Sequence, residues 1–351
     1  MSCPKIHPFI VITISLLLCS ANAIRSFPQT YYSEYNEAPN FINQNKCQNP
    51  LKGSSISVCN PSLIHVTMTL DSKYLRGSIA SVHSILKHAS CSQNIFVHFI
   101  VSTSSTSSNL GNIIKSTFPN LNFQIYPFKN EVKVKELISS TIRPALEDPL
   151  NYARIYLGQI LDPCVTRVVY IDSDTIVVDD IQELFFTTLT GSKVIGAPEY
   201  CQVNLTKYFN DPFWSDPILS SVFEGKKACY FNTGVMVMDL GKWRERDYTM
   251  EIEKWMEIQK EKRIYELGSL PPFLLVFGGE IEGIDHRWTQ HGLGGDNVVN
   301  SCRSLHPGRV SLLHWSGKGK PWVRLDQGRP CPVDYLWVPY DLHRVQGFNS
   351  L

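Results

Sequence analysis

Short apolar runs alternate with helix-like segments over the first half of the chain. Three runs are expected to form strands: Ile64–Leu70, Ile95–Val101 and Phe123–Pro127. Between and after them, apolar residues recur every three or four positions, which is typical of helices that cover a sheet. The expected helices are Arg76–His88, Leu110–Phe118 and Tyr152–Leu161. The alternation predicts an α/β fold with a mixed, mainly parallel sheet, because parallel strands need crossover helices.

A further apolar run, Val168–Ile171, leads into two aspartates one residue apart, Asp172 and Asp174. Carboxylates beside a buried strand are costly unless they are paired, hydrogen-bonded or bound to a metal. Because side chains alternate along a strand, aspartates at this spacing are expected on the same side. Such a pair suits Mg²⁺ or Mn²⁺, and ligands of open α/β sheets bind beyond the carboxyl ends of the strands. The pattern therefore predicts a metal site that takes a phosphate compound.

The length and charge of the chain limit the number of domains and the class of partner. The 351 residues are enough for one large catalytic domain or two small ones. The formal net charge of +1 gives no support for a nucleic-acid partner. After residue 190 the chain is rich in loops, aromatic residues, prolines and glycines. An acceptor site is expected in this second half, because binding residues concentrate on loops.

The N-terminus has the pattern of a secretory signal. Lys5 and His7 precede an apolar run, Phe9–Cys19, which is followed by Ala21-Asn22-Ala23. This pattern predicts a signal peptide cleaved after Ala23, with a signal anchor as the alternative. The apolar run is shorter than the ~17–25 residues of a spanning helix. We assign residues 1–23 to the signal peptide or anchor, residues 24–60 to a stem or lid, and residues 61–351 to the catalytic domain.

Two further features fit the secretory lumen. Asn204-Leu205-Thr206 is a sequon, so Asn204 is an expected glycosylation site. Eight cysteines follow the signal, and they contain no C-x-x-C pair, so disulfides rather than a zinc site are expected. These cysteines are Cys47, Cys59, Cys91, Cys164, Cys201, Cys229, Cys302 and Cys331. Cys47 with Cys59 is one candidate pair that would close the N-terminal segment.

Four more motifs accompany Asp172-x-Asp174 in a defined order. They are TMTLDSKY at Thr67–Tyr74, NYAR at Asn151–Arg154, FNTGVMVMD at Phe231–Asp239 and HWSGKGKPW at His314–Trp322. The ordered set, and above all H-x-x-G-x-x-K-P-W, resembles glycosyltransferase family 8. Within that family it is most similar to the plant galacturonosyltransferase-like branch. The resemblance runs from about Ile64 to about Tyr340.

The resemblance implies a GT-A fold, which is a Rossmann-like nucleotide-sugar-binding fold, with a UDP-sugar donor, Mn²⁺ or Mg²⁺, and retention of anomeric configuration. It implies that the metal is held by Asp172, Asp174 and His314. It also implies donor contacts from Asp71 and Tyr74 to the uridine, from Arg154 to the sugar or diphosphate, and from Gly317, Lys320 and Lys318 to the phosphates. Asn232 and Asp239 are implied on or near a strand beside the sugar.

The chain departs from the family pattern before the His314 motif. Many members carry an Asp-Gln pair near the donor anomeric carbon, whereas Gly292–Asn297 contains no glutamine. Asp296, Asn297 or neither takes the place of that pair. Asn232 is the third candidate for a catalytic role.

The branch also implies a substrate and a compartment: galacturonic acid moved from UDP-galacturonic acid to a cell-wall polysaccharide, pectin or xylan, in the Golgi. A donor carboxylate calls for a nearby cation, with Arg154 as the first candidate and Arg76 and Arg287 behind it. Two alternatives remain. Asp172-Ser173-Asp174-Thr175 also fits a haloacid-dehalogenase-like phosphatase with Asp172 as nucleophile. A non-catalytic glycan-binding or scaffold protein on the same fold is the other.

Overall fold

The computed structural model describes residues 34–52, 56–103, 107–141, 144–295 and 301–344. The described residues from Tyr35 to Arg344 belong to one compact unit. The predicted signal peptide or anchor, residues 1–23, lies outside the described residues. Within the described ranges, no helix has both the length and the apolar character needed to cross a bilayer.

The main sheet has eight strands in the order β3-β2-β1-β4-β8-β6-β7, with β9 beside β6. The strands are β1 (Ile64–Thr69), β2 (Ile95–Val101), β3 (Asn122–Pro127), β4 (Arg167–Ile171), β6 (Ile195–Tyr200), β7 (Tyr230–Phe231), β8 (Val235–Asp239) and β9 (Glu282–Ile284). β1 to β4 run parallel, whereas β8 is antiparallel to both β4 and β6. A second, two-stranded sheet pairs β5 (Thr175–Val177) with β10 (Leu312–His314).

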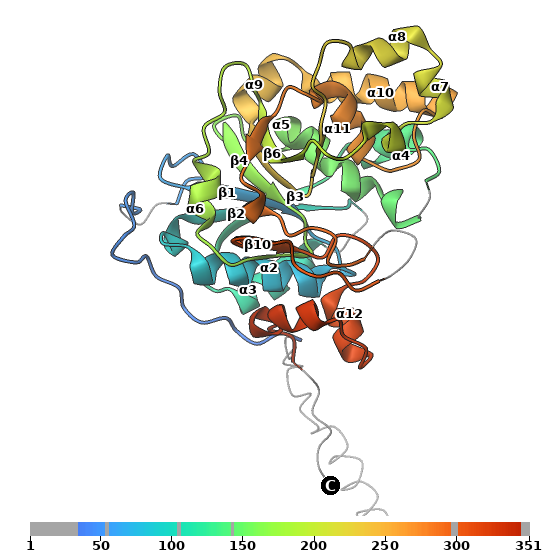
Figure 1. Cartoon of the computed structure of the whole chain (residues 1–351). Coiled ribbons are helices and arrows are strands. Elements are labelled where there is room, and N and C mark those ends of the chain that lie inside the picture. The colour runs from blue at the N-terminus through green and yellow to red at the C-terminus, as the bar shows by residue number, and fades with distance from the viewer. Residues whose placement is uncertain (1–33, 53–55, 104–106, 142–143, 296–300, 345–351) are drawn as a thin grey trace, which may run out of the picture. The chain divides into compact units, whose positions relative to one another are not determined.

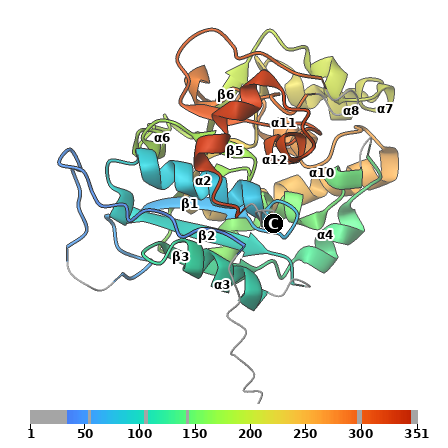
Figure 2. The same cartoon turned by 90° about the horizontal axis from the view of Figure 1, so that it is seen from below.

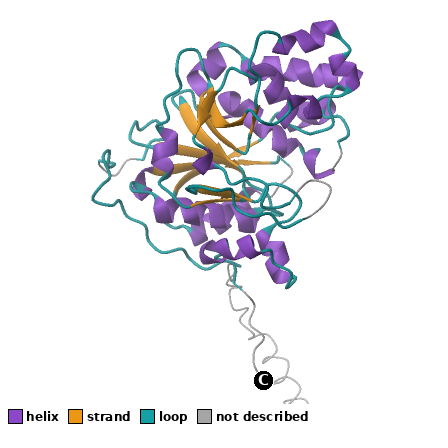
Figure 3. Cartoon of the chain, in the orientation of Figure 1, coloured by secondary structure: helices purple, strands orange, loops and turns teal. Residues whose placement is uncertain are grey.

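Helices lie on both sides of the main sheet (Figure 3). The α-helices are α2 (Leu75–His88), α3 (Ser107–Thr117), α4 (Glu131–Leu137), α5 (Leu157–Ile160), α6 (Ile181–Phe185), α7 (Asp211–Trp214), α8 (Pro217–Ser220), α9 (Leu240–Glu245), α10 (Tyr248–Lys262), α11 (Leu270–Phe277) and α12 (Pro321–Asp326). The 3-10 helices are η1 (Ser92–Asn94), η2 (Pro144–Leu146), η3 (Pro149–Tyr156), η4 (Leu205–Tyr208), η5 (Ser221–Phe223), η6 (His286–Trp288), η7 (Pro332–Leu336) and η8 (Val338–Tyr340).

Alternate residues of β4 face different apolar cores. Val169 and Ile171 belong to the core that includes α2, whereas Val168 and Tyr170 belong to the core that includes Trp243 of α9. Figure 1 shows α2 and α3 on one side of the sheet and α9 to α11 on the other. The strands read as continuous apolar runs because they are buried on both faces. The predicted mixed, mainly parallel sheet is confirmed.

The C-terminal segment covers the outer face of α2. Trp322 of α12 and Trp337 pack with Ala80 of α2 in a third apolar cluster. Figure 2 shows this red segment beside α2. A Cβ at Gly77 would lie 2.7 Å from the Trp322 ring, so glycine permits the close approach. Residues beyond 320 therefore help to fix α2, whose first turn borders the functional site.

The described part of the predicted stem, from Tyr35 on, belongs to the same compact unit as the sheet. Tyr35 forms a β-bridge with His343, and the Ala38 amide donates to the Thr117 carbonyl at 2.8 Å. The eight cysteines form four disulfides, which confirms that prediction. They are Cys47–Cys91, Cys59–Cys164, Cys201–Cys229 and Cys302–Cys331. The candidate pair of Cys47 with Cys59 is wrong, because tertiary contacts bring each of them beside a cysteine much further along the chain.

The helix predicted at residues 152–161 is present, as the 3-10 helix η3 followed by the single turn α5. Asp148 caps η3 by accepting from the Leu150 amide at 3.0 Å. Nε of Arg154 donates to the Asn151 carbonyl at 3.1 Å, so a side chain uses a carbonyl that an α-helix would use itself.

Candidate functional site

Asp172 and Asp174 lie in the turn between β4 and β5, not on a strand, because β4 ends at Ile171. The turn is fixed by its backbone. The Asp172 amide donates to the Gly234 carbonyl at 2.8 Å, and Thr175 Oγ1 donates to the Asp172 carbonyl at 2.9 Å. The two carboxylates lie on the same side, as expected. The expected reason, alternation along a strand, is wrong, because the turn brings them together.

His314 approaches both carboxylates from a distant part of the sequence. It ends β10, which pairs with β5 so that His314 lies opposite Thr175. Nε2 of His314 lies 3.2 Å from Oδ1 of Asp174 and 3.6 Å from Oδ2 of Asp172. The ligand atoms of the three residues all lie within 4.8 Å of one another.

The chemistry of this triad fits a divalent metal. His314 is 2% exposed. Among the described residues its Nδ1 has no hydrogen-bond partner, and its Nε2 faces the two carboxylates without a well-aligned hydrogen bond to either. A cation between the imidazole and the two carboxylates would satisfy all three groups. Two carboxylates and one imidazole make a mixed oxygen and nitrogen ligand set of the kind that Mn²⁺ accepts.

Arg154 and Tyr170 hold one oxygen of Asp172. Nη2 of Arg154 and the hydroxyl of Tyr170 each donate to Oδ1 at 2.9 Å, which leaves Oδ2 on the side of His314. The guanidinium also lies 4.4 Å from the Tyr170 ring centroid and donates to the Thr233 carbonyl at 2.7 Å. Burial alone would lower the pKa of Arg154, but Asp172 and Tyr170 raise it above its usual value. Burial raises the pKa of Tyr170, which keeps its hydroxyl a donor.

Lys320 holds one oxygen of Asp174 in the same way. Its ammonium lies 2.5 Å from Oδ2 and donates to the Trp315 carbonyl at 2.8 Å, while Oδ1 lies nearest to His314. Burial opposes ionisation of Asp174, but Lys320 and His314 outweigh it and hold the pKa below its usual range. Both aspartates thus have one oxygen bound by a cation and the other directed toward His314.

Two glycines allow the close packing of the site. A Cβ at Gly234 would lie 2.5 Å from Oδ2 of Asp172 and would collide with the His314 ring. Gly317 has φ +112, where glycine is favoured, and a Cβ there would collide with the Gly295 carbonyl.

The triad opens into a pocket of about 920 Å³. Asp71, Tyr74, Arg154, Asn232, Gly317 and Lys320 line it together with the triad. Asp71 accepts from the Lys73 and Tyr74 amides at 2.7 and 3.0 Å, which shapes the start of α2. Lys320 lies 5.5 Å from the centroid of the Tyr74 ring. Asn232 accepts from the Gly234 amide at 2.8 Å, so part of its side chain supports the backbone beside the triad.

Several expected residues lie elsewhere. In the antiparallel pairing of β8 with β4, Asp239 lies opposite Arg167, the first residue of β4. Asp239 is therefore at the other end of β4 from Asp172, and its side chain caps α9. Arg76 pairs with Asp326 and Asp341, and Arg287 pairs with Asp179 and Glu183. These three residues do not line the pocket, so their expected contacts with the donor are not supported. Lys318 follows the lining residue Gly317, and its contact with the phosphates stays a prediction. Asp296 and Asn297 lie outside the described residues.

The structure adds pocket residues that the sequence did not single out. The loop of residues 267–270, which leads into α11, forms part of the wall. Other additions are Lys73, Asp148, Tyr208, Tyr230, His291, Arg303 and His306. Tyr208 and Tyr230 stack with their ring centroids 5.2 Å apart. Lys73 belongs to the motif Thr67–Tyr74, from which no role for it was predicted, whereas Asp148, His291, Arg303 and His306 belong to no motif. Only the abundance of aromatic residues after residue 190 indicated Tyr208 and Tyr230.

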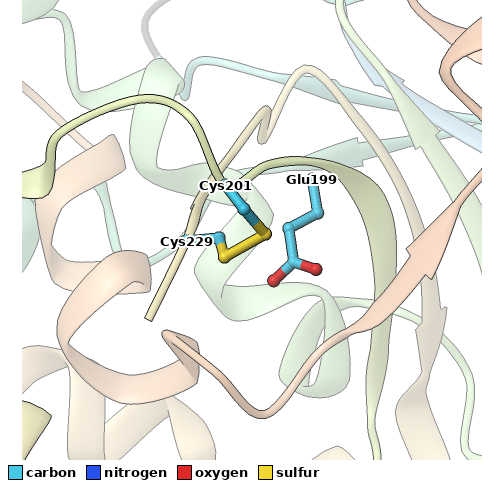
Figure 4. A group of neighbouring side chains, drawn as sticks. All are labelled: Glu199, Cys201 and Cys229. Carbon is cyan, nitrogen blue, oxygen red and sulfur yellow. A yellow bond between two sulfur atoms is a disulfide. The ribbon is translucent and has the colours of Figure 1, made fainter. Parts of the chain in front are cut away.

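A second group of potential ligand atoms does not resemble a metal site. Glu199, Cys201 and Cys229 lie together, but the two sulfurs are joined in a disulfide (Figure 4). A disulfide offers no thiolate for a metal. Among the described residues, the triad is therefore the better candidate.

Known proteins resemble this chain in sequence. Residues 65–326 match the model of glycosyl transferase family 8. The chain is 60% identical over 353 residues to probable galacturonosyltransferase-like 10 of Arabidopsis thaliana, which covers 99% of this chain and 96% of that relative. It is 62% identical over 329 residues to probable galacturonosyltransferase-like 9 of the same plant, covering 90% and 84%.

Solved structures support the fold. A complex of the galactosyltransferase LgtC with donor and acceptor sugar analogs matches with a TM-score of 0.58 and 18% identity, covering 80% of this chain and 97% of that one. The bifunctional glycosyltransferase WbbM matches with a TM-score of 0.53 and 18% identity, covering 82% and 53%. These likenesses, together with the observed sheet, confirm the predicted GT-A fold.

Proposed function

The chain belongs to glycosyl transferase family 8, and from this premise we propose that it is a metal-dependent, retaining glycosyltransferase that uses a UDP-sugar. The observation that carries the metal dependence is the convergence of the buried His314 Nε2 with one oxygen each of Asp172 and Asp174, at 3.6 and 3.2 Å. Family membership makes the chain a glycosyltransferase and leaves the phosphatase alternative without support.

We assign roles to the residues that line the pocket. Asp172, Asp174 and His314 would hold Mn²⁺ or Mg²⁺, which when bound neutralises charge on the departing diphosphate. Lys320 adds a cation at the phosphates, and the absence of a side chain at Gly317 lets the diphosphate approach the backbone. Asp71 and Tyr74 face the uridine.

Arg154 has a positioning role in addition to its place in the pocket wall. Its guanidinium binds Asp172 and two backbone carbonyls, so most of its donors are in use. Asn232 is the described candidate for a polar group beside the transferred sugar. Asp296 and Asn297 remain proposals on sequence alone.

We further propose galacturonic acid as the sugar, and pectin or xylan in the Golgi as the acceptor. The names of the Arabidopsis thaliana relatives support the sugar. The pocket wall also holds several cations that suit a donor carboxylate: Lys73, Arg154, Arg303 and Lys320. The signal peptide or anchor at residues 1–23, the stem at 24–60 and the catalytic domain at 61–351 remain part of this proposal, and the family match falls inside the last.

The test is UDP release by the purified chain from a panel of UDP-sugars with Mn²⁺, alone and with oligogalacturonides. UDP-galacturonic acid should be turned over faster than UDP-galactose. If the protein neither binds UDP nor releases it from any donor, the proposed glycosyltransferase activity is wrong. A non-catalytic glycan-binding scaffold is then favoured. A clear preference for a neutral sugar would overturn the donor assignment alone.

A further inference from the structure

Asp334 is a fully buried carboxylate in the C-terminal segment that covers α2. It lies beyond residues 65–326, which match the family model, and it belongs to none of the sequence motifs. It does not line the pocket. Because a buried carboxylate is costly unless it is paired and hydrogen-bonded, the partners of Asp334 indicate its role.

Four donors from the described residues hold this carboxylate. Arg324 of α12 donates to both oxygens, from Nη2 to Oδ1 at 2.6 Å and from Nε to Oδ2 at 2.8 Å. Nε1 of Trp315 donates to Oδ1 at 2.9 Å, and the Cys331 amide donates to Oδ2 at 2.8 Å. A carboxylate bound by a guanidinium fork and two further donors is fixed in both position and orientation.

The bond from Trp315 restrains the segment that carries His314. The Trp315 side chain is fully buried, and its amide donates to the Asp174 carbonyl at 2.9 Å. Its carbonyl accepts from the Lys320 ammonium at 2.8 Å. Because Asp334 holds the indole of this residue, a shift of Trp315 is opposed, and with it a shift of the neighbouring His314.

Arg324 extends the restraint to residues 291–295, which contribute to the pocket wall. Its Nη2 donates to the Leu293 carbonyl at 3.0 Å, and the Leu293 amide donates to the His314 carbonyl at 3.2 Å. A Cβ at Gly294 would lie 2.5 Å from a backbone oxygen of the HWSGKGKPW motif, so the two segments are in close contact. The Arg324 guanidinium thus joins Asp334 to the strand partner of the His314 segment.

A further connection runs through Cys331. Its amide donates to Asp334, and its sulfur is joined to Cys302. The two residues after Cys302, Arg303 and Ser304, line the pocket. Asp334 is therefore linked to several stretches of the pocket wall that are distant from one another in sequence.

We infer that Asp334 is a positioning residue for the metal site, which acts through Trp315 and Arg324 on the place of His314. The inference rests on the proposed metal-binding role of the triad. A buried ion pair gives little net stability over apolar residues of similar volume, whereas its directional bonds fix a geometry. Loss of the Asp334 charge should therefore change the metal affinity of the folded protein and not only its stability.

The experiment compares Asp334→Asn with Asp180→Asn in the full chain. Asp180 is a second buried aspartate, which accepts from the Ser90 and Gln182 amides and does not line the pocket. Mn²⁺ is titrated into each protein, and electron paramagnetic resonance of free Mn²⁺ gives the Kd and the number of sites per chain. The Kd should rise about 10-fold in Asp334→Asn, as for other groups that orient a metal ligand. Asp180→Asn should keep the wild-type Kd.

The two measured quantities distinguish positioning from stability. Partial unfolding lowers the number of sites per chain but leaves the Kd of the folded molecules unchanged. The Mn²⁺ concentration that gives half-maximal UDP release should rise by the same factor as the Kd. An Asp334→Asn protein with fewer sites and the wild-type Kd overturns the inference.

Trp315→Phe decides the case in which Asp334→Asn does not fold. It keeps an aromatic ring and the Arg324–Asp334 pair but loses the indole donor, so the Kd should rise about 3-fold, as for one lost hydrogen bond. The matched control is Trp243→Phe, which loses a buried bond to Thr249 Oγ1 outside the pocket and should keep the wild-type Kd. A wild-type Kd in Trp315→Phe overturns the inference.

The wild-type chain separates this inference from the proposed function. If the wild type binds Mn²⁺ and the variants bind it equally well, the inference about Asp334 is wrong and the proposed metal site stands. If the wild type binds no Mn²⁺, the proposed metal site is wrong, and the inference is overturned with it.

Discussion

Arg154 binds Asp172 through one carboxylate oxygen and so directs the other toward His314. We expect Arg154→Lys to lower Mn²⁺-dependent turnover about 10- to 100-fold, because an ammonium cannot reproduce the guanidinium contacts to Asp172 and the Thr233 carbonyl. The same substitution should cost about 1–3 kcal/mol of unfolding free energy, since buried acceptors lose their donors.

A matched control is Arg244→Lys. Arg244 also donates to several backbone carbonyls, including those of Gly158 and Val165, but it lies outside the pocket wall. The Arg244→Lys variant should be less stable than the wild type, whereas its Mn²⁺ affinity and turnover should stay near the wild-type values. Equal turnover in both variants would show that Arg154 serves stability alone.

The metal triad is tested by direct binding. Asp172→Asn, Asp174→Asn and His314→Ala should each weaken Mn²⁺ binding at least ~10-fold and abolish UDP release, because each removes one of three ligands. Electron paramagnetic resonance of free Mn²⁺ gives the affinity independently of activity. Asp239→Asn, at the opposite end of the sheet, should bind Mn²⁺ normally. Near-normal affinity in any triad variant would remove that residue from the ligand set.

Gly234→Ala should damage the site without altering any ligand. The added methyl group would collide with His314 and lie 2.5 Å from Asp172 Oδ2, so the triad must open. We expect weaker Mn²⁺ binding and little turnover. The control is Gly283→Ala on β9, where a Cβ would lie 3.5 Å from Glu199, an ordinary contact. If both variants behave alike, the packing argument fails.

Two buried histidines should make stability pH-dependent. His65 Nδ1 lies 3.0 Å from His98 Nε2, and His98 Nδ1 lies 3.1 Å from the Tyr126 hydroxyl, which itself bonds to Asp162. Burial lowers the pKa of His65 from 6.5 to about 4 and that of His98 to about 3, the latter also through His65. The unfolded chain therefore binds more protons below pH 6.5.

It follows that unfolding free energy should be highest above about pH 6.5 and fall as pH drops toward about 4, by up to about 3 kcal/mol for His65 alone. Urea unfolding across this range measures the slope. The double variant His65→Gln with His98→Gln should flatten it, and an unchanged slope would assign the acid sensitivity to other groups.

The disulfides should differ in their contribution to stability. Cys59–Cys164 closes a separation of 105 residues and Cys201–Cys229 one of 28. In the chain-entropy account, replacing the first pair by serine should cost about 1 kcal/mol more than replacing the second. Denaturant unfolding of the two double variants measures this difference. The reverse order would show that native contacts outweigh loop entropy here.

The sequence predicted most reliably the short segments in which a buried strand is followed by polar site residues. The apolar runs of β1, β2 and β4 are continuous because the sheet is covered on both faces, and their bounds were predicted closely. The family resemblance implies that Asp172, Asp174 and His314 share one metal, and in the structure their ligand atoms lie within 4.8 Å of one another. Their convergence depends on motif order, because no local pattern places residue 314 beside residue 172.

What could not be predicted depends on tertiary contacts. The cysteine pairs and the partners of Arg76 and Arg287 join segments distant in sequence, which spacing alone does not encode. Asp239 lies at the wrong end of the sheet because β8 is antiparallel to β4, whereas a parallel strand would have carried it toward the site. The loop at residues 267–270 lines the pocket without any signature in its side chains.

The pairing of β10 with β5 also sets the order in which the molecule can acquire its site during synthesis. The two aspartates leave the ribosome more than a hundred residues before His314, and Lys320 follows later still. Until β10 docks, the nascent chain holds two neighbouring carboxylates without the imidazole or the ammonium that balances them. A truncated product ending before Leu312 would contain the residues of β1 to β9 but lack His314 and Lys320. The three candidate ligands are therefore present together only once the chain has been translated to near its C-terminus.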